Sequence, residues 1–383
     1  MATTTTRPRP DSSKDHYMST DEGTPRGPVK PPRDNGGDGD GASFLNPVLS
    51  GKQILAIAGV AAVVGVLWPV LDLNIALFVL YTVVLGTLAV YLLARTVEGS
   101  RRATDRLVTC LVVSAFGLAM VPLVSVALSV IELGIKRFDV QFFTYSMRGV
   151  VGEGGGAYHA IMGTLIITAI ATLVAVPIGI FAAIYLVEYG NKNRLSRALT
   201  FFVDVMTGIP SIVAGLFAYS LFVLVFGPGA RAGIIGATAL VVLMIPTVVR
   251  STEEMLRLVP NELREASYAL GVPKWLTIAK VVLPTAIAGI ATGVTLAIAR
   301  IIGETAPLLV TVGITTGVNL NPFSGRMATL PVFSYYSYAT PGVPPQPFID
   351  RAWTGLLVLI IIVMALNIIA RLISKFFAPK TGR

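Results

Sequence analysis

Two charged residues stand inside one of the long hydrophobic segments, in the run Ala297-Ile-Ala-Arg300-Ile-Ile-Gly-Glu304-Thr-Ala-Pro307. Four positions separate Arg300 from Glu304, which predicts that both side chains lie on one face of a continuous helix. A charge near the bilayer centre costs at least about 2.5–3.5 kcal/mol on insertion scales, so neither residue is expected to be incidental. The Arg300 guanidinium offers a planar fork for an anion, Glu304 could orient it, and Thr305 adds a hydroxyl. The alternative interpretation is an ion pair that only holds helices together.

The rest of the chain offers little catalytic chemistry. One cysteine, Cys110, excludes a disulfide within the chain, and two histidines, His16 and His159, argue against a histidine-based catalytic or metal site. The run Gly152-x-Gly154-Gly-Gly156 lacks the Lys-Ser/Thr of a phosphate-binding loop, so we expect a flexible connection there. We therefore expect a non-catalytic protein with no metal and no cofactor.

The composition indicates a membrane protein. The chain has 383 residues, of which 54% are hydrophobic and 13% are charged, whereas about 25% of residues are charged in a soluble domain. The charges cluster between long apolar runs, as expected where lipid surrounds helices. In a soluble protein the net charge of +9 would suggest nucleic acid as a partner. Here it is explained by positive loops that orient the chain in a membrane, and no nucleic acid is expected.

About 20 apolar residues are needed to cross the hydrocarbon core of a bilayer. Eight segments meet this requirement, which predicts an all-α polytopic membrane protein with about eight transmembrane helices. The expected spans are Gln53–Leu71, Ile75–Ala94, Leu107–Val130, Ala160–Val187, Val203–Phe226, Gly233–Val249, Thr285–Thr311 and Trp353–Ile373.

Lysine and arginine are distributed unevenly between the two sides that these spans define. Arg95 to Arg106, Lys192 to Arg197 and Arg250 to Lys280 fall on one side, together with both termini. The opposite side carries only Lys136, Arg137, Arg148, Arg231, Arg326 and Arg351. Because positive loops remain in the cytoplasm, we expect a multi-pass protein of the bacterial plasma membrane with both termini cytoplasmic.

The two ends of the chain are expected to be tails. Residues 1–50 are rich in Pro, Gly and charge and almost free of large apolar side chains. Such a segment cannot bury enough apolar surface to offset the entropy lost on ordering, so we expect a disordered cytoplasmic tail. Residues 378–383 are expected to form a short cytoplasmic tail as well.

The connection Arg250–Lys280 is long and has helical character. Ser251–Glu254 is typical of a helix start, with acidic residues in the first turn. Pro260 should end that helix, and a second short helix is expected over Glu262–Leu270. Gly271 would end this second helix by adopting the left-handed conformation.

Within this connection lies Glu265-Ala-Ser-x-x-x-Gly271, followed after nine residues by Val281-Val-Leu-Pro284. This pattern resembles the EAA loop of ABC importer permeases, with Ser in place of the second Ala and Val in place of Ile. The resemblance implies that the short helix docks in a cleft of a partner ATPase and that Leu283-Pro284 restarts the chain as the next span. The coupling residues that it implies are Glu265, Ala266, Ser267, Ala269, Leu270, Gly271, Leu283 and Pro284.

Three further stretches narrow the resemblance. The Arg300 segment, Met327-Ala-Thr-Leu-Pro331 and the aromatic run Tyr335-Tyr336-Ser-Tyr338 are similar to the PstA-type permease of phosphate importers. The tyrosines are also typical of an aromatic belt at the membrane interface. The resemblance covers residue 107 to the C-terminus, which implies a six-helix permease core at 106–377 with a coupling loop at 250–284. Residues 51–105 would form an extra N-terminal transmembrane hairpin.

The resemblance implies a permease subunit of an ATP-driven importer that moves inorganic phosphate into the cytoplasm. The implied partners are a second homologous permease, two copies of an ABC ATPase, an extracytoplasmic phosphate-binding protein and membrane lipid. ATP hydrolysis would then be carried by the partner ATPase. One alternative is a permease of the same type for sulfate or molybdate. An alternative of another class is a membrane channel or a membrane-anchored regulator without an ATPase partner.

Overall fold

The computed structural model of this chain describes four ranges of residues, 51–71, 75–97, 99–190 and 193–377. Helices are present in all four ranges, and none of the four contains a strand. The expected tails at 1–50 and 378–383 lie outside the described residues. A helix satisfies its backbone hydrogen bonds internally, which is what a lipid environment requires of a spanning segment.

The α-helices have the following bounds: α1 Gly51–Leu71, α2 Ile75–Val97, α3 Ser100–Gly134, α4 Val140–Thr144, α5 Tyr158–Ile184, α6 Arg194–Thr207, α7 Ser211–Phe226, α8 Gly233–Arg257, α9 Asn261–Ala269, α10 Lys274–Thr277, α11 Leu283–Ile302, α12 Ala306–Thr311, α13 Leu330–Ala339 and α14 Gln346–Phe377. Two π-helical turns, Tyr185–Tyr189 and Ile278–Val282, extend α5 and precede α11. Among the described residues, six helices are long and apolar enough to cross a membrane, or seven if the bent pair α6 and α7 is one span. The 21-residue helix α1 is not in that count.

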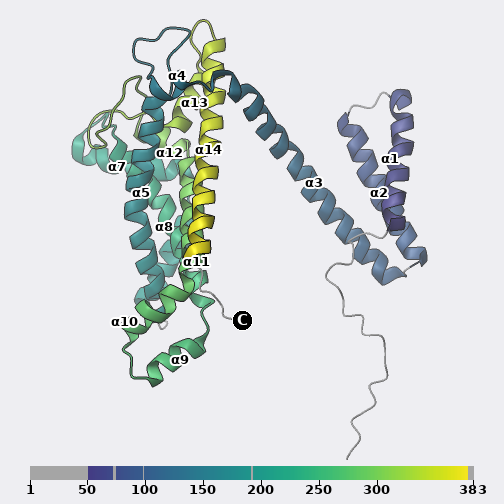
Figure 1. Cartoon of the computed structure of the whole chain (residues 1–383), viewed down its shortest axis with the longest axis horizontal. Coiled ribbons are helices and arrows are strands. Elements are labelled where there is room, and N and C mark those ends of the chain that lie inside the picture. The colour runs from purple at the N-terminus through teal and green to yellow at the C-terminus, as the bar shows by residue number, and fades with distance from the viewer. Residues whose placement is uncertain (1–50, 72–74, 98, 191–192, 378–383) are drawn as a thin grey trace, which may run out of the picture. The chain divides into compact units, whose positions relative to one another are not determined.

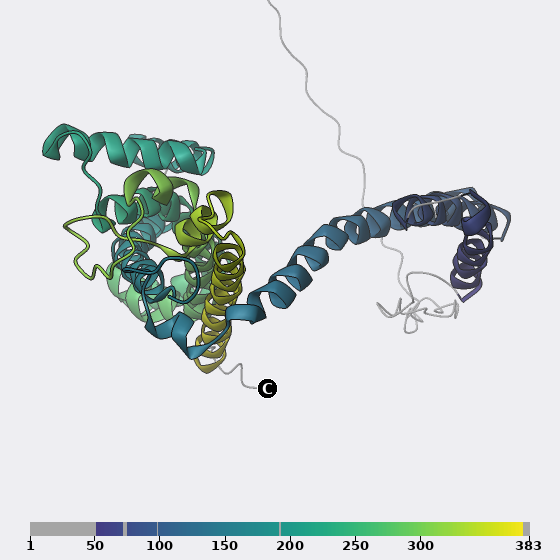
Figure 2. The ribbon, with the colours of Figure 1, turned by 90° about the horizontal axis from the view of Figure 1, so that it is seen from above.

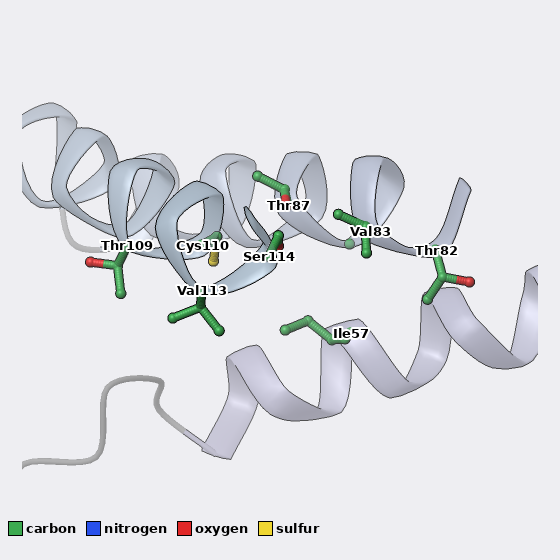
Figure 3. A pocket seen from close by; sticks show the side chains of 9 residues that line it. Ile57, Thr82, Val83, Thr87, Thr109, Cys110, Val113 and Ser114 are labelled. Atoms are coloured by element: carbon green, nitrogen blue, oxygen red, sulfur yellow. The ribbon is translucent and has the colours of Figure 1, made fainter. Parts of the chain in front are cut away.

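The chain divides into two compact units, residues 1–116 and 117–383, so the division falls inside α3. In the first unit α1 packs beside α2, and the first half of α3 completes a small pocket with them (Figure 3). Cys110 of α3 faces this pocket opposite Ile57 of α1 (Figure 3). The thiol is free and only 8% of the residue is exposed, so Cys110 is a packing residue of this unit.

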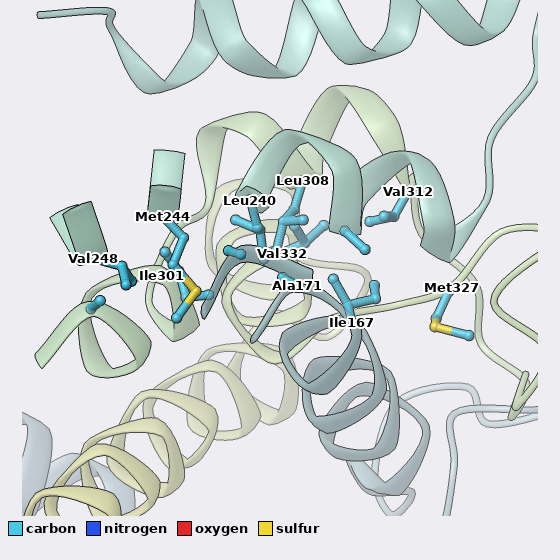
Figure 4. Packing of buried hydrophobic residues seen from close by; sticks show 13 residues of the cluster. Ile167, Ala171, Leu240, Met244, Val248, Ile301, Leu308, Val312, Met327 and Val332 are labelled. Atoms are coloured by element: carbon cyan, nitrogen blue, oxygen red, sulfur yellow. The ribbon is translucent and has the colours of Figure 1, made fainter. Parts of the chain in front are cut away.

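In the second unit α5, α8, α11 and α14 run alongside one another (Figure 1). Helix α7 lies across their direction and packs on α8 and α12 (Figure 2). The core of the unit joins Ile167 and Ala171 of α5 to Leu240 and Met244 of α8, all at most 1% exposed (Figure 4).

Small residues let α5 and α8 approach closely, as in other membrane helix pairs. A Cβ added to Gly179 of α5 would lie 2.6 Å from Cγ1 of Val248 in α8. Nearer the start of α5, Gly163 packs directly against the backbone of the segment before α13. A Cβ added to Gly163 would lie 2.0 Å from the Ala328 carbonyl oxygen.

Two of the expected spans are interrupted. The span expected at Val203–Phe226 is two helices, α6 and α7, which meet at 110°. Pro210 causes this break, because in a continuous helix its ring would clash with the carbonyl of the residue four positions earlier. The span expected at Thr285–Thr311 ends at Ile302, since the ring of Pro307 would clash in the same way with the carbonyl of Gly303.

Candidate functional site

The segment between α8 and α11 carries the short helix that the sequence predicts. Helix α9 spans Asn261–Ala269, within one residue of the expected bounds at each end. Pro260 precedes it, and Gly271 follows it with φ +77°, a conformation that side-chain-bearing residues rarely adopt. The backbone N–H groups of Gly271 and Val272 bond back to Tyr268 and Ser267, which closes the end of the helix.

One other expectation for this segment is wrong. Ser251–Glu254 does not start a helix, because α8 continues unbroken to Arg257. Helix α11 begins at Leu283-Pro284 as expected, although the backbone is already helical from Lys274 and passes through the π-helical turn Ile278–Val282 into it. The wider turn accommodates Pro284, whose nitrogen has no hydrogen to donate.

The implied coupling residues divide between the two faces of α9. Ala266, Ala269 and Leu270 are exposed, and Leu270 keeps 83% of its surface. Ser267 points inward, where its hydroxyl lies 2.8 Å from that of Thr277 in α10, and both residues are buried. The outward face is therefore apolar and unpartnered, and the inward face is fixed by a hydrogen bond.

Glu265 also lies on the outward side of α9. It is exposed and makes no hydrogen bond or ion pair with the described part of the chain. The last two implied coupling residues, Leu283 and Pro284, lie at the start of α11, where Leu283 packs against the hydrophobic cluster around Leu256 and Val282.

Sequence reasoning missed the ion pair that fixes α9 in place. Nε and Nη2 of Arg264 donate to Oε1 of Glu188 at 3.1 and 2.8 Å, and the side chains are 12% and 5% exposed. Arg264 also donates to the carbonyls of Leu256 and Val259 at 2.9 and 2.6 Å and to Asn261 at 3.3 Å. All five guanidinium hydrogens are thus used.

Glu188 lies in the π-helical turn that extends α5, 76 residues from Arg264. Lys274 of α10 reaches the same turn, where its ammonium donates to the Glu188 carbonyl and lies 4.9 Å from the centre of the Tyr189 ring. The end of α5 therefore holds the helices on both sides of Gly271.

The structure does not bring Arg300 and Glu304 together. Arg300 is in the last turn of α11, and Gly303 ends that helix, so Glu304 is no longer on the same helical face. In the described residues neither side chain has a hydrogen-bond or ion-pair partner. Arg300 is exposed and Glu304 is half-buried in the isolated chain. The expectation of one face is therefore wrong, and so is the alternative of an internal ion pair.

Thr305 has different neighbours from Arg300. It directly precedes α12, without a side-chain capping bond, and lines a cleft of about 580 Å³ together with Ser334, Tyr335 and Tyr338 of α13. The two exposed tyrosines of the aromatic run, 50% and 59% accessible, thus face the same cleft as Thr305. Two motifs that are 30 residues apart in the sequence meet at this cleft.

The glycine-rich run, expected to be a flexible connection, is a loop whose carbonyls are hydrogen-bonded to two arginines. Arg351 of α14 is 1% exposed, and its Nη1 donates to the carbonyls of Gly152 and Gly154, each at 2.8 Å. Arg137 donates to the carbonyl of Gly155 at 2.9 Å. Positive φ angles at these three glycines turn the carbonyls toward the two arginines.

Comparison with known proteins gives consistent matches. Residues 175–383 match the family described as binding-protein-dependent transport system inner membrane component. The chain is 47% identical over 288 residues to phosphate transport system permease protein PstA 1 of Mycobacterium tuberculosis, which covers 74% of this chain and 91% of that protein. It is 46% identical over 279 residues to PstA of Mycobacterium leprae, which covers 72% of this chain and 90% of that protein.

A solved structure shares the fold. A bacterial ABC transporter involved in the import of the acidic polysaccharide alginate superposes with a TM-score of 0.51 at 13% identity, covering 73% of this chain and 98% of that one. At this identity the similarity concerns the helical arrangement alone.

Proposed function

Because this chain belongs to the family of binding-protein-dependent transport system inner membrane components, and within it to the PstA-type permeases, we propose that it is the permease subunit through which an ATP-driven importer moves inorganic phosphate into the cytoplasm. The observation that carries this proposal is 47% identity across 91% of a phosphate transport permease. The subunit itself is a non-catalytic, multi-pass membrane component, and a partner ATPase hydrolyses ATP.

The partners are a second homologous permease, two copies of an ABC ATPase and an extracytoplasmic phosphate-binding protein. The exposed apolar face of α9 supports the ATPase contact. Ala266, Ala269 and Leu270 leave room on that face for the wall of a cleft, and Glu265 beside them is free to bond to a partner. In the described part of the chain nothing covers this face, whereas the opposite face is fixed by Ser267 and Arg264.

Motion of the ATPase reaches the membrane through the contacts of α9. When two ATPase copies close on ATP, they displace α9 as a rigid body. The Arg264–Glu188 pair carries that displacement to the end of α5, and the continuous helix from Lys274 to Ile302 carries it to Arg300. The bundle then rocks and opens the pathway to the opposite side of the membrane.

Arg300 contributes to that pathway. It is an exposed arginine on a membrane-spanning helix without a partner in the described chain, and facing lipid there would be costly. It therefore faces an aqueous pathway or the second permease, where its guanidinium can bind the oxygens of phosphate. Glu304 and Thr305 follow at the break between α11 and α12 and line the next part of the route.

The domain arrangement and orientation follow from the same proposal. Residues 106–377 form the permease core with the coupling loop at 250–284, and 51–105 form an additional N-terminal hairpin. The protein lies in the bacterial plasma membrane with both termini in the cytoplasm, which places α9 on the side of the ATPase.

The test is transport by the purified complex in proteoliposomes, with phosphate, sulfate and molybdate in competition. We expect ATP-dependent phosphate uptake that excess sulfate or molybdate does not suppress. Suppression by one of these anions would assign the chain to that oxyanion. Uptake without ATP, or purification without a P-loop ATPase, would support the channel or regulator alternative.

A further inference from the structure

A second pocket, with several polar side chains in its lining, lies away from Arg300, between the start of α5, the segment after α12, and α13. It encloses about 280 Å³ and is lined by His159, Thr315, Thr316, Tyr336, Ser337 and Thr340, with Met147, Ile314, Phe333 and Phe348 as its apolar walls. This volume is at the lower end of the roughly 300–1,000 Å³ of ligand pockets and suits a small ion. The proposed topology places the pocket at the extracytoplasmic end of the bundle.

Two buried side chains in this pocket lack partners. His159 is 2% exposed, its ring stands edge-on to Phe333 at 5.5 Å, and its Nδ1 is buried without a hydrogen bond to the described residues. Ser337 is 8% exposed, and its hydroxyl also has no hydrogen-bond partner among them, although the oxygen itself is not fully buried. A buried polar atom without a partner is unfavourable, so the His159 nitrogen in particular is suited to a bound molecule.

The pocket presents donors and no carboxylate. Thr316 also has a free hydroxyl among the described residues, and the Thr315 hydroxyl only accepts, from the backbone of Gly317 at 3.4 Å. Thr340 is different, because its hydroxyl donates to the carbonyl of Tyr336 in its own helix. Four hydroxyls, those of Thr315, Thr316, Tyr336 and Ser337, and an imidazole can therefore donate, and the lining includes no aspartate or glutamate.

A buried positive charge stands behind one wall. The guanidinium carbon of Arg351 lies 4.5 Å from the centre of the Phe348 ring, and Phe348 lines the pocket. Nε and Nη2 of Arg351 are buried without a partner in the described chain, and no carboxylate there pairs with the guanidinium. Asp350 offsets part of this charge, but the nearby Arg137 adds to the positive field, which favours an anion in the pocket.

We propose that this pocket is an entry site for the oxyanion, in which His159, Ser337 and the two threonines bind phosphate before it reaches Arg300. This assignment rests on the proposed transport of phosphate. Neutral donors backed by a distant charge bind weakly and release readily, which suits a transit site. Arg351 is a positioning residue, because it holds the glycine loop and polarises the pocket without touching the ion.

The experiment measures binding of inorganic phosphate to the assembled membrane complex in nanodiscs with the phosphate-binding protein omitted, by ³¹P line broadening up to millimolar concentration. His159→Phe keeps the ring against Phe333 and removes the nitrogens, and Ser337→Ala removes one hydroxyl. We expect each variant to weaken binding at least threefold at normal subunit abundance. Thr252→Val is the control, because Thr252 is a fully buried, unpartnered hydroxyl of α8 outside the pocket, and it should bind as the unaltered complex does.

Equal binding in His159→Phe, Ser337→Ala and Thr252→Val would overturn the entry site. The same conclusion would follow if the variants changed only the phospholipid retained by the complex, because the ligand would then be a lipid headgroup. Uptake by the intact unaltered complex is measured in parallel. Absence of phosphate uptake by the unaltered complex would count against phosphate transport itself. Normal uptake by that complex, together with equal phosphate binding in the unaltered complex and the pocket variants, would count only against the entry site.

Discussion

Arg264 of α9 and Glu188 at the end of α5 form a buried ion pair in which two guanidinium N–H groups bond to one carboxylate oxygen, at 2.8 and 3.1 Å. The pair joins a short exposed helix to the helix that packs most extensively on α8. Since the remaining hydrogens of Arg264 bond to the end of α8 and to α9 itself, α9 cannot shift without moving the bundle. This linkage gives the coupling proposal a physical route.

Breaking the pair should uncouple and destabilise the subunit. Glu188→Gln leaves a buried arginine without its counter-charge, and loss of one partner of a buried pair costs about 3–5 kcal/mol. We expect a lower melting temperature and reduced uptake per assembled complex. Arg257→Ala is the control, since the Arg257 side chain is 68% exposed and its buried partner Glu253 keeps a second ion pair with Arg250. Equal melting temperatures for both variants would refute the role of the pair.

Gly271→Pro should abolish transport while membrane insertion is preserved. Gly271 has φ +77°, whereas proline is fixed near −65°, so the turn between α9 and α10 cannot form. Gly271→Ala, which costs about 1–2 kcal/mol in this conformation, should be milder. Replacing Glu265 and Ala266 together by bulky residues should have the same effect as proline by blocking the outward face. The readout is ATPase stimulation in the complex, and normal stimulation in these variants would contradict docking through α9.

The close approach of α5 to the segment before α13 predicts a sensitive glycine. Gly163→Ala would place a Cβ 2.0 Å from the carbonyl oxygen of Ala328, so the backbone must move. Overpacking of this kind costs about 1–3 kcal/mol, and we expect lower abundance and a lower melting temperature. Gly117→Ala in α3, where no atom lies within 4 Å, should change neither. If the two substitutions behave alike, the packing described here is wrong.

The sequence predicted those elements that local signals define. Helix α9 was placed to within one residue because Pro260 and Gly271 limit it on either side. The long helices are predictable for the same reason, since each apolar run is by itself long enough to indicate a membrane span. The bend between α6 and α7 follows a local signal, Pro210, but the hydrophobicity on both sides of it is continuous and predicts a single span.

The parts that the sequence did not predict depend on distant residues. Nothing in the segment around Glu188 indicates a bond to Arg264, 76 positions later. The composition of the glycine loop alone predicts a flexible connection, because its hydrogen-bond partner, Arg351, lies almost 200 positions away. The prediction that Arg300 and Glu304 share a helical face is wrong for another reason. It requires the helix to continue past Arg300, but Gly303 and Pro307 end it.

Variants at the break after α11 separate the roles of the charged residues. Arg300→Lys keeps the charge but loses the planar fork, so phosphate uptake should fall substantially in a normally assembled complex. Glu304→Gln should be milder, because Glu304 does not bond to Arg300 in the described chain. A severe effect would instead mean that Glu304 itself contacts protonated phosphate. Uptake is measured beside subunit abundance, and uptake by Arg300→Lys equal to that of the unaltered subunit would show that the fork is not used.

The most direct test is ATP-driven accumulation of phosphate in proteoliposomes, compared per assembled complex for the unaltered subunit and for Arg300→Gln. This substitution removes the positive charge that offsets the desolvation of phosphate, while the exposed position of Arg300 leaves the packing of α11 unchanged. The account predicts accumulation by the unaltered complex and close to none by the variant. Equal accumulation by both, or none by the unaltered complex, would contradict it.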